Sequence, residues 1–403
     1  MSSMRGEGGV NSLCRPIFIS TYEPTTCGIA TFTQDLADAV DRAAGEPVSR
    51  VVAIRPNGPA LEAGDRVVFE IDKSDRASYA EAAEFCNSHS CTHVCLQHEY
   101  GLFAGHRGNA VLSLVRGIEK PLFTTLHTVK KKPGGEARDI VRELGTRSEC
   151  LVAMSPMAPG MLAEHYGLST EQVKCIPHGV HDVTFSGAEI RQKRASIHGA
   201  PILLTMGLLR PDKGIEHAID ALPDILEQFP NAVYVIAGQT HPARVRREGE
   251  QYRRKLKQRA RDLGVRERVQ FVNRYLSLRE FLLFMSAADV YVSPHLGREQ
   301  ITSGTLAYAV AAGTPVVSTP YPHAQDMWRA GAVVLTGFED STTLAEKVLL
   351  VLKKPPLREH IEKASMRLRK NMLWNRVGQR YYDLFASVTS PAARCSGAAE
   401  GGS

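Results

Sequence analysis

Small polar residues precede a run of good helix formers in the second half of the chain. Residues 303–305 (Ser-Gly-Thr) offer a helix cap and bare amides, 306–312 form the helix, and Gly313 ends it. Amides at a helix start bind anions such as phosphate, because the helix dipole reinforces them. The preceding loop brings Glu299 and Gln300 to the same place. The pattern predicts an anion site, although alone it also fits an ordinary crossover in an α/β sheet.

Two cations stand in a turn that follows an apolar strand. Lys213 and Arg210 come after the strand 202–206, and Gly207 and Gly214 flank the turn. Sites in α/β sheets collect at strand ends, so this glycine-flanked turn is a candidate site segment. The alternative is a solvated turn lysine.

Candidate side chains also follow strands in the first half of the chain. Gly28 precedes a helix, His98 and Glu99 follow one apolar strand, and His127 follows the next. Ligands of parallel α/β sheets lie outside the carboxyl ends of the strands, where these residues are expected. His127 also fits a core histidine, and His98 and Glu99 also fit a structural pair under a loop.

Strands alternate with helices along the whole chain, which predicts parallel sheets covered by helices on both faces. The pattern restarts after a polar stretch, so we expect two α/β domains, at 15–183 and 184–370. Their facing strand ends imply a cleft between them. The last helix, 371–390, is expected to cross back onto the first domain.

Three further expectations concern single segments. The polar stretch 184–199 is expected to be a hinge, and 215–229 and 248–263 are each expected to form one helix. The terminal segments 1–14 and 391–403 lack the apolar patterning of packed elements, so we expect both to be disordered.

Composition bounds the class of the protein. The 403 residues carry a net charge of +6, with 43% hydrophobic and 23% charged residues, which favours anionic ligands without indicating a nucleic-acid binder. The chain start lacks an apolar signal-peptide core and no run is long enough to span a membrane, so a cytoplasmic location is expected. The eight scattered cysteines favour reduced thiols.

Two kinds of local pattern leave alternatives open. Cys91, His93 and Cys95 would share one face of a strand and could hold zinc, but the second ligand pair of a zinc site is missing. The basic stretch 244–268 is interleaved with acids, which favours a solvated helix face over a membrane or nucleic-acid patch. Residues 130–132 are three lysines that could attract an anionic acceptor or a lipid head group, and aromatic residues for base stacking are missing there.

Five stretches, in this order, resemble retaining glycosyltransferases of family 4, which have the GT-B fold. They are Cys-Gly-Ile-Ala-Thr-Phe-Thr at 27–33, Leu-His at 126–127, Ile-Pro-His-Gly-Val at 176–180, Gly-Leu-Leu-Arg-Pro-Asp-Lys-Gly at 207–214 and Ala-Ala-Gly-Thr-Pro-Val-Val at 311–317. The likeness covers roughly residues 15 to 388 of the sequence. It implies two Rossmann-like domains across a cleft, the first on the acceptor side and the second binding the donor, with the C-terminal helix crossing back.

The resemblance also implies a role for each candidate residue. The catalytic set would be His127, Lys213 and Glu299. The donor-binding set would be Gly207, Arg210, Gln300, Ser303, Gly304, Thr305 and Tyr308, and the acceptor-side set would be Gly28, His98 and Glu99. Lys213 would pair with the leaving phosphate, and His127 would contact hydroxyls of the donor sugar. No metal ion or other cofactor is implied.

The sequence departs from the family at both acidic positions of its Glu-x7-Glu element. They fall on Gln300 and Tyr308, and Glu299, one residue earlier, could supply the first carboxylate. In the family the second acid holds the ribose hydroxyls of the nucleotide, whereas tyrosine has a single hydroxyl on a rigid ring. Leu208 also stands where the family has arginine, and Arg210 could substitute for it.

The expected function is a retaining glycosyl transfer from a nucleotide-sugar or sugar-phosphate donor to a hydroxyl of a carbohydrate or glycolipid acceptor in the interdomain cleft. The resemblance implies that the departing phosphate assists the incoming hydroxyl, which agrees with the lack of an evident protein nucleophile. No nucleic acid is expected as partner, peripheral membrane contact fits a glycolipid acceptor, and the oligomeric state is left open. Two alternatives remain: a phosphorylase-like enzyme that uses a sugar phosphate, and a sugar-binding GT-B protein without catalysis.

Overall fold

The computed structural model describes residues 13–25, 27–55 and 64–389, and the chain forms two compact units. Unit 1 comprises the chain up to 154, residues 158–176 and the chain from 374 onward, whereas unit 2 comprises 155–157 and 177–373. The domain limits predicted at 183 and 370 stay predictions. The predicted disordered segments 1–14 and 391–403 lie outside the described residues, apart from residues 13 and 14, and so does Cys395.

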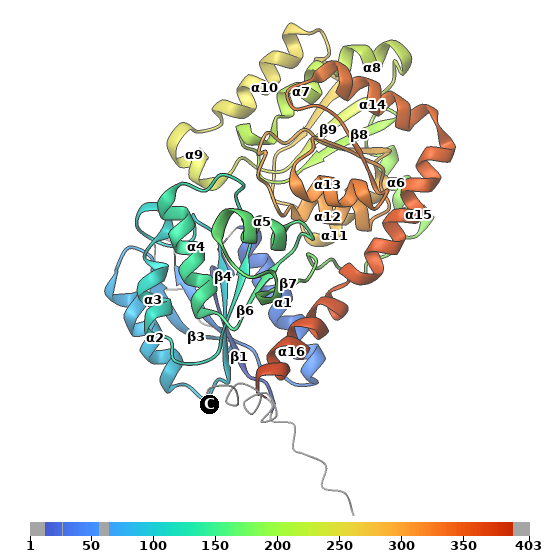
Figure 1. The fold of residues 1–403 in the computed structure, drawn as a ribbon. Helices are drawn as coiled ribbons and strands as arrows, with labels where there is room; N and C mark the ends of the chain where they lie inside the picture. The colour runs from blue at the N-terminus through green and yellow to red at the C-terminus, as the bar shows by residue number, and fades with distance from the viewer. Residues whose placement is uncertain (1–12, 26, 56–63, 390–403) are drawn as a thin grey trace, which may run out of the picture. The chain divides into compact units, whose positions relative to one another are not determined.

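Unit 1 contains a seven-stranded parallel sheet with the strand order β3-β2-β1-β4-β5-β6-β7 (Figure 1). Its strands are β1 (Pro16–Ser20), β2 (Arg50–Arg55), β3 (Val67–Asp72), β4 (His93–His98), β5 (Leu122–Leu126), β6 (Cys150–Ala153) and β7 (Val173–Cys175). Every residue of β1, β4 and β5 is buried, as expected for parallel strands with helices on both faces. The helices are α1 (Gly28–Ala44), α2 (Ala77–Ser88), α3 (Val111–Gly117), α4 (Gly135–Arg147), α5 (Ala158–Tyr166) and α16 (Trp374–Thr389), with short turns η1 (His106–Gly108) and η2 (Thr170–Gln172).

The last helix, α16, belongs to unit 1 and lies against α1 (Figure 1). A Cβ built on Gly378 of α16 would lie 2.6 Å from the Cβ of Ala39 in α1, so the two helices are in close approach. The ring of Phe385 lies 6.3 Å from that of Phe18 and 5.0 Å from that of Phe123, which joins α16 to the core under the sheet. The prediction that the C-terminal helix returns to the first domain is confirmed.

Unit 2 contains a six-stranded parallel sheet with the strand order β10-β9-β8-β11-β12-β13. Its strands are β8 (Ile202–Met206), β9 (Val233–Ala237), β10 (Val269–Val272), β11 (Val290–Ser293), β12 (Val316–Ser318) and β13 (Val333–Leu335). The helices are α6 (Gly187–Ala195), α7 (Ile215–Asp220), α8 (Leu222–Gln228), α9 (Pro242–Glu248), α10 (Gln251–Asp262), α11 (Leu278–Ala287), α12 (Gly304–Ala311), α13 (Pro322–Arg329), α14 (Ser341–Lys353) and α15 (Pro355–Met372), with short turns η3 (Pro211–Lys213) and η4 (Arg266–Arg268). The predicted class, two α/β units of parallel strands, is confirmed.

The polar stretch 184–199 contains a helix, α6, and its predicted role as a hinge stays a prediction. The Ser186 side chain accepts a hydrogen bond from the Glu189 backbone N–H at 3.2 Å. In return, the Glu189 carboxylate accepts one from the Ser186 N–H at 2.8 Å. This reciprocal cap satisfies two of the amides that a helix start leaves without partners, and it lets a polar segment begin a helix.

Of the two segments predicted as single helices, 215–229 is divided into α7 and α8, whereas 248–263 corresponds to α10, which α9 precedes. Pro223 stands in the first turn of α8, and its missing N–H cannot continue the hydrogen-bond ladder of α7. Gly249 has a φ of +60° between α9 and α10, and its N–H donates to the Val245 carbonyl oxygen at 2.9 Å. A glycine in this left-handed conformation ends a helix, so α10 starts in a new direction.

Within the described part of the chain, no helix is both long and apolar enough to cross a membrane. The same residues contain no group of three His, Cys, Asp or Glu side chains that could hold a metal ion. Cys91 and His93 are buried in unit 1, where the carbonyl oxygen of Cys91 accepts from Lys120 Nζ at 2.9 Å and the His93 ring stacks on Phe385.

Candidate functional site

Three predicted residues of unit 2 meet beyond the carboxyl end of β8. Gly207 follows this strand with a φ of +118°, a conformation that favours glycine. A Cβ built on Gly207 would lie 3.4 Å from Cγ2 of Thr305 and 4.0 Å from Nζ of Lys213. The turn that carries Lys213 and the start of α12 are therefore neighbours, as expected for strand ends of one parallel sheet.

Backbone contacts hold the turn that carries Lys213. Gly214 has a φ of +61°, and a Cβ there would overlap the carbonyl oxygen of Pro294. The Leu296 N–H donates to the Asp212 carbonyl oxygen at 2.8 Å. The turn after β8 is thus fixed on the loop after β11, which also leads to α12.

Lys213 is a cation that forms no ion pair with any residue that the structure describes. Its Nζ makes neither a hydrogen bond nor a salt bridge with any described residue, although part of the side chain is exposed. Burial of the ammonium group, and then the Arg210 guanidinium, lower the pKa of Lys213 to about 8, whereas Asp212 acts in the opposite direction. An anionic ligand would supply the missing counter-charge, because a desolvated cation gains more from an opposite charge than a solvated one.

Arg210, Asp212 and His295 form a second polar group beside Lys213. Arg210 Nη2 donates to Asp212 Oδ2 at 2.5 Å, and His295 Nε2 lies 3.6 Å from the same oxygen. The Gly297 N–H donates to His295 Nδ1 at 2.8 Å, so a neutral ring carries its proton on Nε2, toward Asp212. Burial first, and then Lys213, lower the pKa of His295 to about 3, which keeps the ring neutral.

At the start of α12, the backbone amides of Ser303 and Leu306 have hydrogen-bond acceptors. Ser303 Oγ accepts from the Leu306 N–H at 3.3 Å, and the Ser303 N–H donates to Nδ1 of His323 at 2.9 Å. The amides of Gly304 and Thr305 lie between these two, and they donate to no acceptor in the described residues. Two bare amides at a helix start, beside an ammonium group, can hold one phosphate.

Two histidines, His178 and His323, lie against this helix start, and neither was predicted from the sequence as a site residue. A Cβ built on Gly304 would lie 3.0 Å from Nε2 of His178, whose Nδ1 donates to the Gly179 carbonyl oxygen at 2.7 Å. Burial, and to a smaller extent His178, lower the pKa of His323 to about 3, so His323 acts as a neutral acceptor. The position of His323 at the end of the next strand-to-helix loop could have indicated it.

Both side chains at the Glu-x7-Glu positions form hydrogen bonds within unit 2. Gln300 Nε2 donates to the Thr302 carbonyl oxygen, within its own loop. The Tyr308 hydroxyl lies 2.7 Å from Nδ1 of His181, and the two rings are stacked with centroids 6.2 Å apart. Glu299 is half-buried in the loop between β11 and α12.

In unit 1, His127 stands directly beyond β5 and is 9% exposed. Its Nε2 lies 2.9 Å from Oε1 of Gln97, and its ring meets Phe32 of α1 edge to face, with centroids 4.9 Å apart. Phe32 is one helical turn after Gly28, so His127 lies near the start of α1. A Cβ built on Gly28 would meet no described atom within 4 Å, so there is free space beside this residue.

His98 and Glu99 do not pair with each other. His98 is fully buried, burial lowers its pKa to about 4, and neither ring nitrogen has a hydrogen-bond partner among the described residues. Glu99 instead accepts from the Tyr100 N–H at 2.9 Å and from Thr128 Oγ1 at 2.5 Å. The structural pair is therefore absent, and contact of either residue with an acceptor stays a prediction.

The chain resembles known glycosyltransferases in sequence. Residues 187–367 match the family Glycosyl transferases group 1. A phosphatidyl-myo-inositol mannosyltransferase of Mycobacterium leprae is 25% identical over 283 residues, which is 70% of this chain and 71% of that protein.

Solved structures share the fold over almost the whole chain. Sucrose-phosphate synthase from Thermosynechococcus elongatus has a TM-score of 0.73 at 19% identity, covering 93% of this chain and 99% of the other. Anabaena HepE in complex with UDP and glucose has a TM-score of 0.70 at 16% identity, covering 93% and 100%.

Proposed function

We propose that this chain, a glycosyltransferase of the GT-B type with a Glycosyl transferases group 1 domain at residues 187–367, transfers a sugar from a nucleoside-diphosphate donor to a hydroxyl acceptor with retention. The observation that carries the proposal is the ammonium group of Lys213, which has no ion pair with the described residues and lies beside the bare start of α12. A diphosphate brings the counter-charge that both features require.

In the proposed reaction the bond between the anomeric carbon and the phosphate oxygen breaks on the same face on which the acceptor oxygen attaches. The proton of the acceptor hydroxyl passes to an oxygen of the departing phosphate, so no protein nucleophile is needed. Lys213 and the amides of Gly304 and Thr305 stabilise the negative charge that grows on that phosphate. Arg210, held by Asp212, adds a second cation, and the contact of His127 with sugar hydroxyls stays a prediction.

The proposed reaction needs no metal ion. In many phosphate-transfer sites a divalent cation offsets the charge of the diphosphate, and here Lys213, Arg210 and the dipole of α12 offer positive charge at one place. Addition of a chelator should therefore leave the rate unchanged, and a loss of activity that Mg²⁺ restores would show that this part of the proposal fails.

The proposed acceptor is the hydroxyl of a carbohydrate or glycolipid. The relative from Mycobacterium leprae is named for a mannosyl transfer to a phosphatidyl-myo-inositol, which is a lipid with an anionic head group. In unit 1 Lys131 and Lys132 are exposed beyond β5, and Lys130 lies over the Tyr100 ring at 4.8 Å. These cations support an anionic acceptor and a peripheral contact of the protein with a membrane.

A phosphorylase-like enzyme is the second candidate, and the contacts of Tyr308 favour it. This residue occupies the position of the family's ribose-binding acid, and its single hydroxyl already meets His181 at 2.7 Å. An enzyme that uses a sugar phosphate and free phosphate needs no ribose contact, while it would still use Lys213 and the start of α12.

A thermal-shift screen separates the two candidates. Uridine, guanosine and adenosine diphosphates, simple sugar phosphates and inorganic phosphate would be compared on the purified full chain, because any ligand of the folded state raises the melting temperature. Stabilisation by one nucleoside diphosphate is expected. Stabilisation by phosphate or a sugar phosphate alone would instead support the phosphorylase-like candidate.

Replacing Tyr308 with glutamate should strengthen nucleotide binding if the ribose lies at α12. A carboxylate accepting from two ribose hydroxyls makes charge-assisted hydrogen bonds, so we expect about a tenfold lower dissociation constant. The measurement is calorimetric titration with a nucleoside diphosphate and with its 2′,3′-dideoxy form. Tyr308→Phe is the control, because it also removes the hydroxyl from His181. An equal gain for the dideoxy form would contradict the ribose contact.

Nucleotide binding should weaken as the pH rises above about 8. The free protein loses the Lys213 proton in this range, since the pKa of that ammonium group is lowered to about 8. A diphosphate that binds only the charged form should lose up to about tenfold in affinity per pH unit. Calorimetric titrations at several pH values measure this loss, and Lys213→Arg, which stays charged, should remove it. A wild-type affinity that is constant to pH 9.5 would contradict the assignment.

A further inference from the structure

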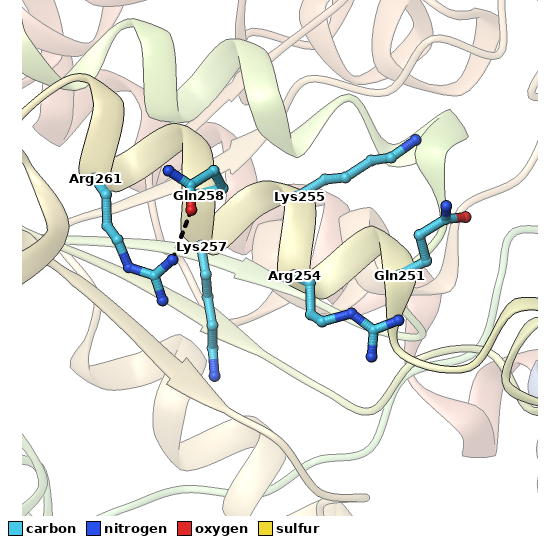
Figure 2. A pocket seen from close by; sticks show the side chains of 6 residues that line it. All are labelled: Gln251, Arg254, Lys255, Lys257, Gln258 and Arg261. Atoms are coloured by element: carbon cyan, nitrogen blue, oxygen red, sulfur yellow. Dashed lines mark hydrogen bonds between the residues drawn. The ribbon is translucent and has the colours of Figure 1, made fainter.

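A row of cations runs along the outer face of α10 (Figure 2). Six residues line one open surface depression of about 480 Å³: Gln251, Arg254, Lys255, Lys257, Gln258 and Arg261. Positions 254, 257 and 261 lie on one side of a helix and span about 10 Å along it. Figure 2 shows that the charged ends spread out from the helix and do not converge on one point.

Three acids near these cations form ion pairs with other arginines. Glu248 and Glu250, which lie in the basic stretch, pair with Arg244 at 3.0 Å and Arg253 at 2.9 Å, and Asp220 of α7 pairs with Arg259. Asp262 accepts from Gln258 Nε2 at 2.7 Å. In the described residues none of the four cations of the row has an ion pair with a carboxylate, so the mixed composition still leaves a positively charged face.

The opposite face of α10 fixes the helix in unit 2. Tyr252, Leu256 and Ala260 are buried, and the Tyr252 hydroxyl donates to Glu216 at 2.6 Å. Arg253 is buried as well, and its Nη2 donates to the Gly238 carbonyl oxygen at 3.1 Å. The apolar side of α10 is therefore not free to enter a bilayer, and only the charged side can meet a partner.

We propose that the cationic row of α10 docks the protein on an anionic lipid bilayer. Four cations that diverge from a rigid helix suit a plane of many anionic head groups better than one small anion, which requires converging donors. No exposed aromatic residue stands in the row to stack on bases, which argues against a nucleic acid. The inference deepens the proposed membrane contact and rests on it, but vesicle binding needs neither donor nor acceptor, so its failure leaves the proposed transfer reaction standing.

The test is co-sedimentation of the full chain with vesicles of mixed phosphatidylcholine and phosphatidylglycerol, and with vesicles of phosphatidylcholine alone. Binding is expected only to the anionic vesicles, and it should fall as added salt screens the charges. Each cation near such a surface contributes about fivefold in partitioning, so R254Q/K255Q/K257Q/R261Q should weaken binding by about two orders of magnitude or more. Glutamine keeps the helix propensity of these positions, and an unchanged melting temperature would confirm the fold.

A matched control removes four cations from α15 and its start, with K354Q, R358Q, R367Q and K370Q. It changes the net charge equally and should keep binding within a few-fold of wild type. Equal loss in the two variants would show a general charge effect and would overturn the assignment to α10. Equal binding to neutral vesicles, or binding to a single-stranded oligonucleotide in place of anionic vesicles, would overturn it as well.

Discussion

Replacing Lys213 with methionine is expected to lower turnover by about 10²–10³-fold without lowering the melting temperature. The loss follows because one preorganised group that stabilises developing phosphate charge contributes about this factor. Stability should not fall, since the ammonium group makes no hydrogen bond or ion pair with the described residues and methionine keeps most of the buried stem. The measurement is steady-state turnover with the donor found by the screen, together with thermal unfolding.

Lys213→Arg is the matched control for this variant. It keeps the charge but changes the geometry, so it should retain more activity than methionine. A methionine variant that loses stability and activity together would indicate a structural lysine, and one that keeps full activity would place the phosphate elsewhere.

Replacing Gly378 with alanine should destabilise unit 1 by about 1–3 kcal/mol, as is usual for overpacking. Replacing a glycine inside an exposed helix with alanine normally stabilises the protein, because alanine has the higher helix propensity. At Gly378 the added methyl group would overlap the backbone of Ala39, so α16 must move away from α1. Urea unfolding, followed by the fluorescence of Trp374 at the start of α16, would measure the change.

Gly160→Ala in α5 is the control for this prediction. A Cβ on Gly160 would meet no atom within 4 Å, so the same substitution should raise the stability by about 0.5 kcal/mol. Opposite signs at the two glycines would support the α1–α16 contact. A stabilising Gly378→Ala would show that the last helix does not pack closely on α1.

Most of the fold could be predicted because buried parallel strands appear in the sequence as short continuous apolar runs. Pro16–Ser20 and Val233–Ala237 are of this kind, and each is buried along its whole length. Helix limits were predicted wrongly where a single residue, and not the average composition of the segment, determines where a helix begins or ends. Pro223 divides a long apolar pattern, and the Ser186 capping box starts a helix inside a polar stretch.

The site could be predicted only in part. The rule that ligands lie at strand ends brings Gly207, Lys213 and Thr305 together, and the structure places them side by side. The strand-end rule does not predict which histidines contact the start of α12. His178 reaches Gly304, and His323 reaches Ser303, across contacts that only the tertiary structure creates.

The sequence also could not predict which acids pair with which arginines around α10. Asp220 and Arg259 stand 39 positions apart, on α7 and α10, and no local pattern links them. The interleaved acids therefore favoured a solvated helix face without a binding role, whereas in the structure Glu248 and Glu250 pair with arginines beside the row.

Calorimetric titration of nucleoside diphosphates into the wild type, Lys213→Arg and Lys213→Met at neutral pH would show whether Lys213 holds the leaving diphosphate. One diphosphate is expected to bind the wild type at a single site and to bind Lys213→Arg with a similar affinity. Binding to Lys213→Met is expected to be about tenfold to a hundredfold weaker, because one charge-assisted contact is lost. Equal affinity for the wild type and Lys213→Met would contradict the claim that Lys213 holds the leaving diphosphate.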